Sequence, residues 1–181
     1  MRDAALLGAR LLLGGYMGIH ASQKLLGKFH GPGLEAISGV FEDNGLYPGR
    51  EMALAASATE IAGGVLTITG IADPVGPLAV AGAMGVAAAF NRKRGLMAVR
   101  NGVELPLVYA TLALTLAATG AGKYKIGPAI PGRLAAVGAL VGGVAAGALI
   151  AKMVTSKPAP AEMVPAETVP AEEGAEPTAE S

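Results

Sequence analysis

Residues 52–71 read MALAASATEIAGGVLTITGI and carry one ionisable side chain, that of Glu60. A helix rises about 1.5 Å per residue, so a stretch of this length can cross a bilayer's hydrocarbon core, which is about 30 Å thick. Four further apolar stretches lie along the chain, and the charges fall mostly between them. The sequence predicts an all-α membrane protein with five spans, at about Ala4–Ala21, Met52–Ile71, Val75–Phe90, Leu105–Thr119 and Leu134–Ala151.

The composition favours the same class. Apolar residues make up 52% of the chain and charged residues only 15%, which is too little polar covering for a water-soluble domain. The chain has no cysteine, which excludes disulfides, thiolate metal ligands and iron–sulfur ligation. Its two histidines, His20 and His30, are predicted on a span and in a Gly-Pro loop respectively. We therefore expect no metal site and no bis-histidine haem.

The net charge of zero hides an asymmetry. All 14 Lys and Arg residues lie within residues 1–157 with eight acidic residues, and residues 158–181 hold six Glu and no base. Residues 156–181 repeat a Pro-Ala-Glu unit and are poor in large apolar side chains, so we expect a disordered acidic tail. The tail is either a solvated spacer or a docking arm for a basic partner. No nucleic-acid partner is expected.

The basic residues predict the orientation. With five spans, nine Lys and Arg fall on the side that holds loops 22–51 and 91–104 and the tail, and four fall on the other side. The positive-inside rule then places the tail in the cytoplasm and the N-terminus outside. We expect a multi-pass protein of a bacterial cytoplasmic membrane, in contact with lipid.

Two ionisable residues fall inside the apolar stretches. An ionised Glu60 at mid-membrane would cost about 2.5–3.5 kcal/mol, so it is expected to face the bundle interior, neutral or paired. Arg10, in the first span, is its predicted partner. The two side chains form either an ion pair that fixes helix register or a buried ligand or proton site.

A polar row follows the end of the first span. Tyr16, His20 and Lys24 recur every fourth residue and share one helix face, with Gln23 beside them. The row could hold an anionic or quinone-like headgroup, with His20 as donor and Lys24 as the charge. The alternative is a polar helix end at the membrane interface.

Other candidates are a loop and a glycine series. Asn101 and Glu104 stand where the fourth span begins, and helix capping would explain both. In the fifth span, Gly138 with Gly142 and Gly143 with Gly147 recur at four-residue spacing, which allows close helix packing. That packing lies either within the bundle or against a partner or second copy.

Several motifs, taken in order, resemble one family. They are Arg10-Leu-Leu-Leu-Gly14, Gln23-Lys24-Leu, Gly31-Pro32-Gly33 followed by Phe41 and Gly45-Leu46, Glu60 with Gly63-Gly64 and Gly70, Asn101-Gly-Val-Glu104-Leu-Pro106, and Gly120-Ala-Gly122-Lys-Tyr124. Together they resemble the DoxX family of small bacterial membrane proteins, over roughly residues 5–127. The family name derives from a membrane subunit linked to thiosulfate oxidation and quinone reduction, and other members are associated with redox stress.

The resemblance implies a four-helix membrane bundle over residues 1–127, to which this chain adds a fifth transmembrane helix at 128–155 and the tail at 156–181. It also implies that Arg10, Lys24, Glu60 and Glu104 form the family's polar signature. We expect a non-catalytic membrane subunit or accessory of a bacterial envelope redox system, working with another membrane protein or redox complex. No cofactor is evident, and quinone is the candidate ligand. The alternatives are a quinone-linked oxidoreductase subunit with a buried Arg/Glu site and a small-solute carrier.

Overall fold

The structure, a computed structural model, describes residues 1–134 and 137–138. This part of the chain is helical and contains no strand. Its elements are α1 (Arg2–Leu26), α2 (Gly33–Asp43), α3 (Gly49–Thr69), α4 (Val75–Asn91), the short 3-10 helices η1 (Arg92–Arg94) and η2 (Ala98–Arg100), and α5 (Glu104–Thr119).

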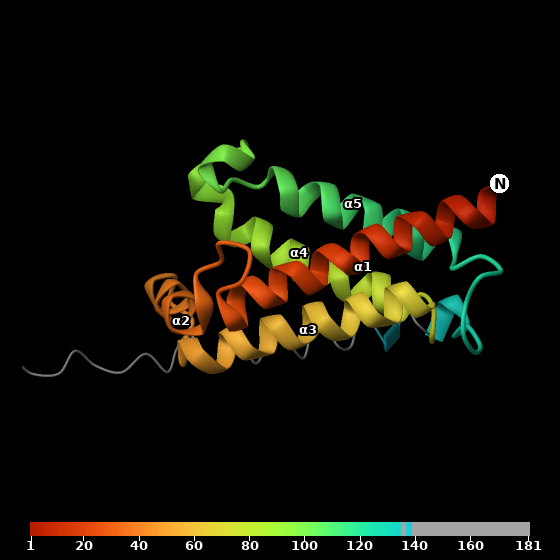
Figure 1. Cartoon of the computed structure of the whole chain (residues 1–181), viewed down its shortest axis with the longest axis horizontal. Helices are drawn as coiled ribbons and strands as arrows, with labels where there is room; N and C mark the ends of the chain where they lie inside the picture. Colours follow the sequence, from red (N-terminus) through yellow and green to blue (C-terminus); the bar gives the residue numbers. More distant parts are fainter. Residues whose placement is uncertain (135–136, 139–181) are drawn as a thin grey trace, which may run out of the picture.

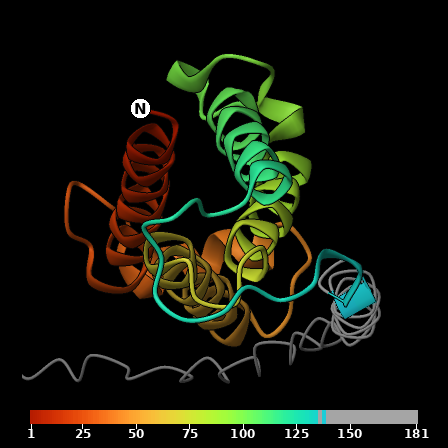
Figure 2. The ribbon, with the colours of Figure 1, turned by 90° about the vertical axis from the view of Figure 1, so that its right-hand side faces the viewer.

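The four longer helices run alongside one another as an up-and-down bundle, and α2 lies against one end of it (Figure 1). Helix α1 packs mainly on α3, α3 on α4, and α4 on α5, whereas α1 and α5 meet more sparsely. Figure 2 shows these four helices nearly end-on. The core between them is built from buried apolar side chains of α1, α4 and α5, namely Leu13, Met17, Val80, Met84, Ala113 and Leu116.

Local signals explain where the helices begin and end. Asp3 lies in the first turn of α1 and Lys24 in its last turn, which suits the helix dipole. Gly27 and Gly70 follow α1 and α3 in the left-handed conformation, with φ of 65° and 69°, which glycine adopts without steric cost. Pro74 immediately precedes α4, where a missing amide proton costs no intrahelical bond.

The first four predicted apolar stretches each form a helix. Of these, α1 and α3 are long and apolar enough to cross a membrane. Helices α4 and α5, with 17 and 16 residues, are shorter. The sequence did not predict α2, which lies in the segment interpreted as a loop and has no fully buried residue.

Helices α1 and α3 approach closely through glycine. A Cβ added at Gly14 would lie 2.6 Å from the carbonyl oxygen of Gly64, and one at Gly64 would lie 3.0 Å from that of Gly14. Neither contact leaves room for a side chain. This pair fixes how α1 lies against α3, and therefore how residues further along the two helices meet.

The predicted fifth span and tail fall mostly outside the described residues. Gly138 is described, and a Cβ there would meet no atom within 4 Å. The other glycines of that series, Gly142, Gly143 and Gly147, and residues 156–181 lie outside the described residues. The close packing predicted for the series stays a prediction.

Candidate functional site: a polar cavity beside α2

A cavity of about 290 Å³ lies between the helices at the end of the bundle that α2 covers. Helices α1 to α5 and the segment between α4 and α5 all contribute to its lining. The polar lining residues are His20, Lys24, Asn44, Glu60, Asn91, Arg94, Asn101 and Tyr109. The larger apolar ones are Ile37, Val40, Phe41, Met84, Phe90, Leu105 and Pro106. The cavity thus combines an apolar body with a small set of polar groups.

An ion pair between Lys24 and Glu60 forms part of the cavity wall. Lys24 Nζ contacts Glu60 Oε1 across the α1–α3 interface. Helical side chains lean toward the N-terminus of their helix, so Lys24, near the end of α1, reaches back toward the bundle centre. Glu60 is only 4% exposed, and its second oxygen, Oε2, has no hydrogen-bond partner among the described residues. The carboxylate is therefore half satisfied, and its free acceptor belongs to a residue that lines the cavity.

Aromatic rings pack against one another across the interface between α1 and α5. The His20 ring meets the Tyr109 ring edge-on, with 5.6 Å between ring centroids, and the Tyr16 ring packs on the same Tyr109 ring with 5.5 Å between centroids. His20 Nδ1 lies 3.2 Å from Gln23 Oε1, and the Gln23 amide nitrogen donates to the Phe29 carbonyl. Since Gln23 Oε1 can only accept, this network assigns the ring proton to Nδ1 and leaves Nε2 as the acceptor of the neutral ring.

The segment between α4 and α5 forms another part of the lining. Asn91 Nδ2 donates to the Gly102 carbonyl at 3.5 Å, and Arg94 Nη1 donates to Asn91 Oδ1 at 3.3 Å. Both Arg94 and Asn101 are exposed, so this part of the wall meets the outside of the protein. Amide and guanidinium donors therefore lie here, whereas the carboxylate of Glu60 is buried.

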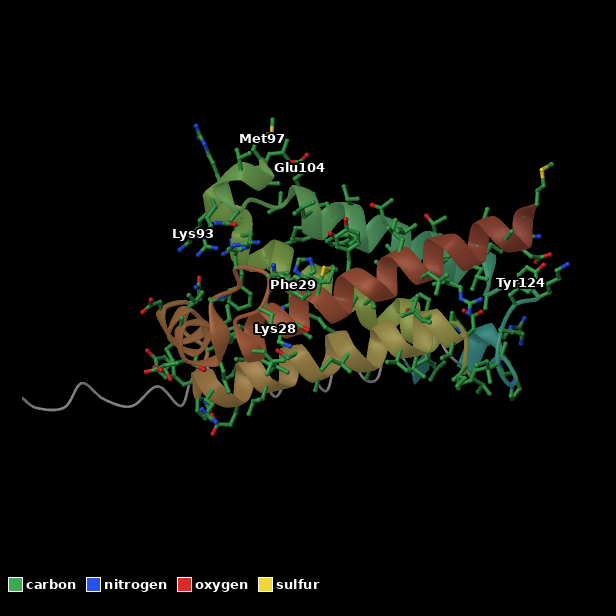
Figure 3. All side chains as sticks on the ribbon, viewed as in Figure 1. Lys28, Phe29, Lys93, Met97, Glu104 and Tyr124 are labelled. Atoms are coloured by element: carbon green, nitrogen blue, oxygen red, sulfur yellow. The ribbon has the colours of Figure 1, made fainter. Side chains whose placement is uncertain are left out.

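Glu104 does not line the cavity but supports the segment that does. Its Oε2 accepts a hydrogen bond from the Ala98 amide at 2.8 Å, and the Glu104 amide donates to the Leu96 carbonyl at 2.9 Å. Figure 3 shows Glu104 beside Met97, at the same end of the bundle as Lys93 and opposite Tyr124. The carboxylate thus ties down η2 and does not cap α5.

The prediction that Arg10 pairs with Glu60 is wrong. Glu60 pairs with Lys24, and Arg10 lies 14 positions before Lys24 on α1, about 21 Å along the helix axis. Arg10 is 2% exposed, and its hydrogen bonds all go to backbone carbonyls at the other end of the bundle. A buried Arg/Glu site is therefore absent from the described residues, and the buried pair is Lys/Glu.

The guanidinium of Arg10 instead joins three segments. Its acceptors are the carbonyls of Thr67 and Ile68, at the end of α3, and those of Ala121 and Tyr124, after α5. The bonds from Nε to Thr67 and from Nη1 to Ala121 and Tyr124 measure 2.7–2.8 Å. Carbonyls in the last turn of a helix have no intrahelical partner and carry partial negative charge, so a buried cation is stabilised there. Arg10 is thus a structural residue that closes this end of the bundle.

Comparison with known proteins identifies the family of the chain. Residues 5–92, which comprise most of α1 and all of α2 to α4, match the DoxX family model. The chain belongs to the DoxX family. It is a membrane protein of that family, and its α1 and α3 have the length and composition of membrane spans. No curated protein and no solved structure matches it.

The matched range of this DoxX protein contains some of the candidate residues and not others. Arg10, His20, Lys24 and Glu60 lie inside residues 5–92, whereas Asn101 and Glu104 lie beyond it, although the resemblance drawn from the sequence extended to residue 127. The cavity crosses that boundary, because Tyr109 and Leu105 of α5 line it with His20 and Glu60.

Sequence reasoning missed three polar residues of the DoxX protein. Tyr109 lies within the fourth predicted span, and Arg94 is one of the basic residues of loop 91–104, yet both line the cavity. Asp73, between α3 and α4, is 8% exposed and its Oδ2 accepts the Ala121 amide at 3.1 Å. No sequence pattern singles out Asp73, which lies between the second and third predicted spans. Within the described residues, no group of three or more His, Asp or Glu side chains is placed to hold a metal ion.

Proposed function

We propose that this DoxX protein is an accessory subunit of a bacterial envelope redox system, and that it holds a quinone-like headgroup in the cavity lined by Lys24 and Glu60. The subunit binds and positions the ring, and a partner protein carries the electrons. The observation that carries this proposal is the half-satisfied, buried carboxylate of Glu60 in the wall of an otherwise mainly apolar cavity.

The size and lining of the cavity favour a small ring. Its volume of about 290 Å³ lies just below the range of about 300–1,000 Å³ for ligand pockets. Phe41, Phe90 and Met84 offer apolar contacts to the faces of a ring, and Tyr109 and His20 add polar atoms at its edge. A few polar groups in an apolar pocket are typical of sites that orient a small molecule.

The membrane placement favours a lipid-soluble ligand. We infer that α4 and α5 cross the cytoplasmic membrane beside α1 and α3, which have the length and composition of spans, so that the protein is multi-pass. The excess of Lys and Arg in loops 22–51 and 91–104 puts the α2 end on the cytoplasmic side. The cavity then lies close to that interface, where a quinone can present its headgroup while its isoprenoid chain stays in lipid.

The sequence supports the need for a partner. With no cysteine, the chain supplies neither a redox thiol nor the ligands of an iron–sulfur cluster. The exposed apolar side chains of α1 and α5, such as Leu12 and Val108, are surfaces for lipid or for a neighbouring membrane helix. The glycines at 138, 142, 143 and 147 and the acidic tail are further candidates for contact with a partner or a second copy.

Purification in mild detergent tests this function. Quinone is extracted and quantified from the purified wild type, from Glu60→Gln and from Glu51→Gln, which changes an exposed carboxylate of the same helix. The proposal expects quinone with the wild type and Glu51→Gln, and a loss of at least about tenfold in occupancy with Glu60→Gln, the effect of about 1.4 kcal/mol in binding. A quinone content equal to that of detergent extracts without the protein contradicts it.

Co-purifying proteins test the other half of the proposal. A redox enzyme of the same membrane should be recovered with the wild type after chemical crosslinking. Recovery of a flavin or haem bound to the isolated chain would instead make it a catalytic subunit.

A further inference from the structure

We propose that the cavity selects the reduced hydroquinone over the oxidised quinone, because the buried side-chain oxygen in its wall that lacks a partner among the described residues, Oε2 of Glu60, is an acceptor. This inference rests on the proposed function and adds a redox-state preference to it. The two forms share nearly the same ring shape and differ in hydrogen bonding: a hydroquinone has two hydroxyl donors, whereas a quinone has only carbonyl acceptors.

Glu60 provides the first acceptor. Paired with the Lys24 ammonium, it is a carboxylate, and a carboxylate accepts hydrogen bonds but donates none. Its Oε2 is buried and has no partner in the part of the chain that the structure describes. A hydroxyl group of the ligand satisfies this oxygen with a charge-assisted hydrogen bond. A quinone carbonyl has no proton to donate to Oε2. Placed there, the carbonyl oxygen and Oε2 would both lack a hydrogen-bond donor in a buried site, which weakens binding.

His20 provides a second acceptor on the neighbouring helix. Its Nδ1 is committed to Gln23, so Nε2 of the neutral ring has a free lone pair. His20 and Glu60 both line the cavity, from α1 and α3 respectively. Of the donors in the lining, Arg94 and Asn101 lie where the wall meets the outside of the protein. The Lys24 ammonium is paired with Glu60, and the Tyr109 hydroxyl can accept as well as donate. Hydroxyl groups of the ligand therefore find hydrogen-bond acceptors in the buried part of the cavity.

This preference has a thermodynamic consequence. A protein that binds the reduced form more tightly raises the reduction potential of the bound couple. For a two-electron couple, each tenfold difference in affinity corresponds to about 30 mV. We expect the hydroquinone to bind about tenfold more tightly, and the bound couple to lie about 30 mV above the free one.

Anaerobic titration of the purified full-length chain in detergent tests the inference. The probes are a short-chain ubiquinone, its hydroquinone, and the dimethyl ether of that hydroquinone, which keeps the ring but has no donor. We expect the hydroquinone to bind about tenfold more tightly than either of the others, a difference of about 1.4 kcal/mol. Glu60→Gln should remove most of the difference, since an amide also donates, and Glu51→Gln should keep it.

The outcomes separate this inference from the function on which it rests. Equal binding of quinone and hydroquinone, or equal binding of the hydroquinone and its dimethyl ether, overturns the redox-state preference and leaves the quinone site standing. Binding of none of the three overturns both. The comparison with the dimethyl ether uses the unchanged protein, so it decides the question even where Glu60→Gln fails to fold.

Discussion

Lys24 and Glu60 form an ion pair that joins the end of α1 to the middle of α3. Lys24 comes from the cytoplasmic end of its helix in the proposed orientation, and its side chain runs inward to meet a carboxylate that neighbouring helices keep from water. The pair therefore places a carboxylate and its counter-ion inside the bundle, at the wall of the cavity.

Removing one partner of this pair should destabilise the protein more than removing both. Lys24→Met leaves a buried carboxylate without its cation, and we expect the free energy of unfolding to fall by about 2 kcal/mol, less than for a fully buried pair because Lys24 is partly exposed. The double variant Lys24→Met/Glu60→Gln should recover part of that loss. Unfolding in detergent followed by circular dichroism measures both, and strictly additive losses contradict the pairing.

Arg10→Lys should weaken the opposite end of the bundle. Lysine keeps the charge but cannot reach the acceptors at the end of α3 and after α5 at once, so several charged hydrogen bonds worth about 1.5–3 kcal/mol each are lost or lengthened. We expect a loss of about 3 kcal/mol in the free energy of unfolding. Arg2→Lys is the matched control, since exposed Arg2 makes one bond of 3.2 Å to the Thr119 carbonyl. Ligand binding by folded Arg10→Lys should stay near the wild-type value.

Gly14→Ala should force α1 and α3 apart. The new Cβ would meet the Gly64 carbonyl at 2.6 Å, and overpacking of this kind costs about 1–3 kcal/mol. At Gly15, the next residue, a Cβ meets nothing within 4 Å, so Gly15→Ala should be neutral or slightly stabilising. Equal effects of the two substitutions on thermal unfolding would show that the helices do not cross at Gly14.

The absence of cysteine allows a direct test of orientation. Lys93→Cys and Lys123→Cys each introduce a single thiol, one in η1 and one after α5. A membrane-impermeant maleimide added to intact spheroplasts should label the cysteine at 123 at once and that at 93 only after permeabilisation. The reverse pattern would place the cavity on the outer side of the membrane.

The apolar stretches predicted the helices well, because lipid-facing and core-facing positions are both apolar and leave a long uninterrupted signal. Helix α2 was missed although Ile37, Val40 and Phe41 carry the three- and four-residue spacing of a helix face, because Gly-Pro-Gly before it indicated a loop. The partner of Arg10 could not be predicted, since backbone carbonyls leave no mark in a sequence. Glu60 was expected to be buried and paired, but choosing between Arg10 and Lys24 required the crossing of α1 and α3.

The residues that line the cavity could likewise be predicted from the sequence only in part. Periodicity grouped His20 with Lys24 on one face of α1, and both line the cavity. Arg94 and Tyr109 join them only through the fold, because α4 and α5 bring them back to α1 over more than 60 positions of sequence.

Photolabelling with a photoreactive short-chain quinone can show whether the ligand binds in the cavity beside Glu60. After illumination of the purified protein and digestion, mass spectrometry locates the labelled residues, with unlabelled quinol as competitor. We expect competed labelling concentrated at the cavity lining of α1, α4 and α5, strongly reduced in Glu60→Gln and retained in Glu51→Gln. Labelling spread over the lipid-facing surfaces, without competition and equal in the two variants, would contradict it.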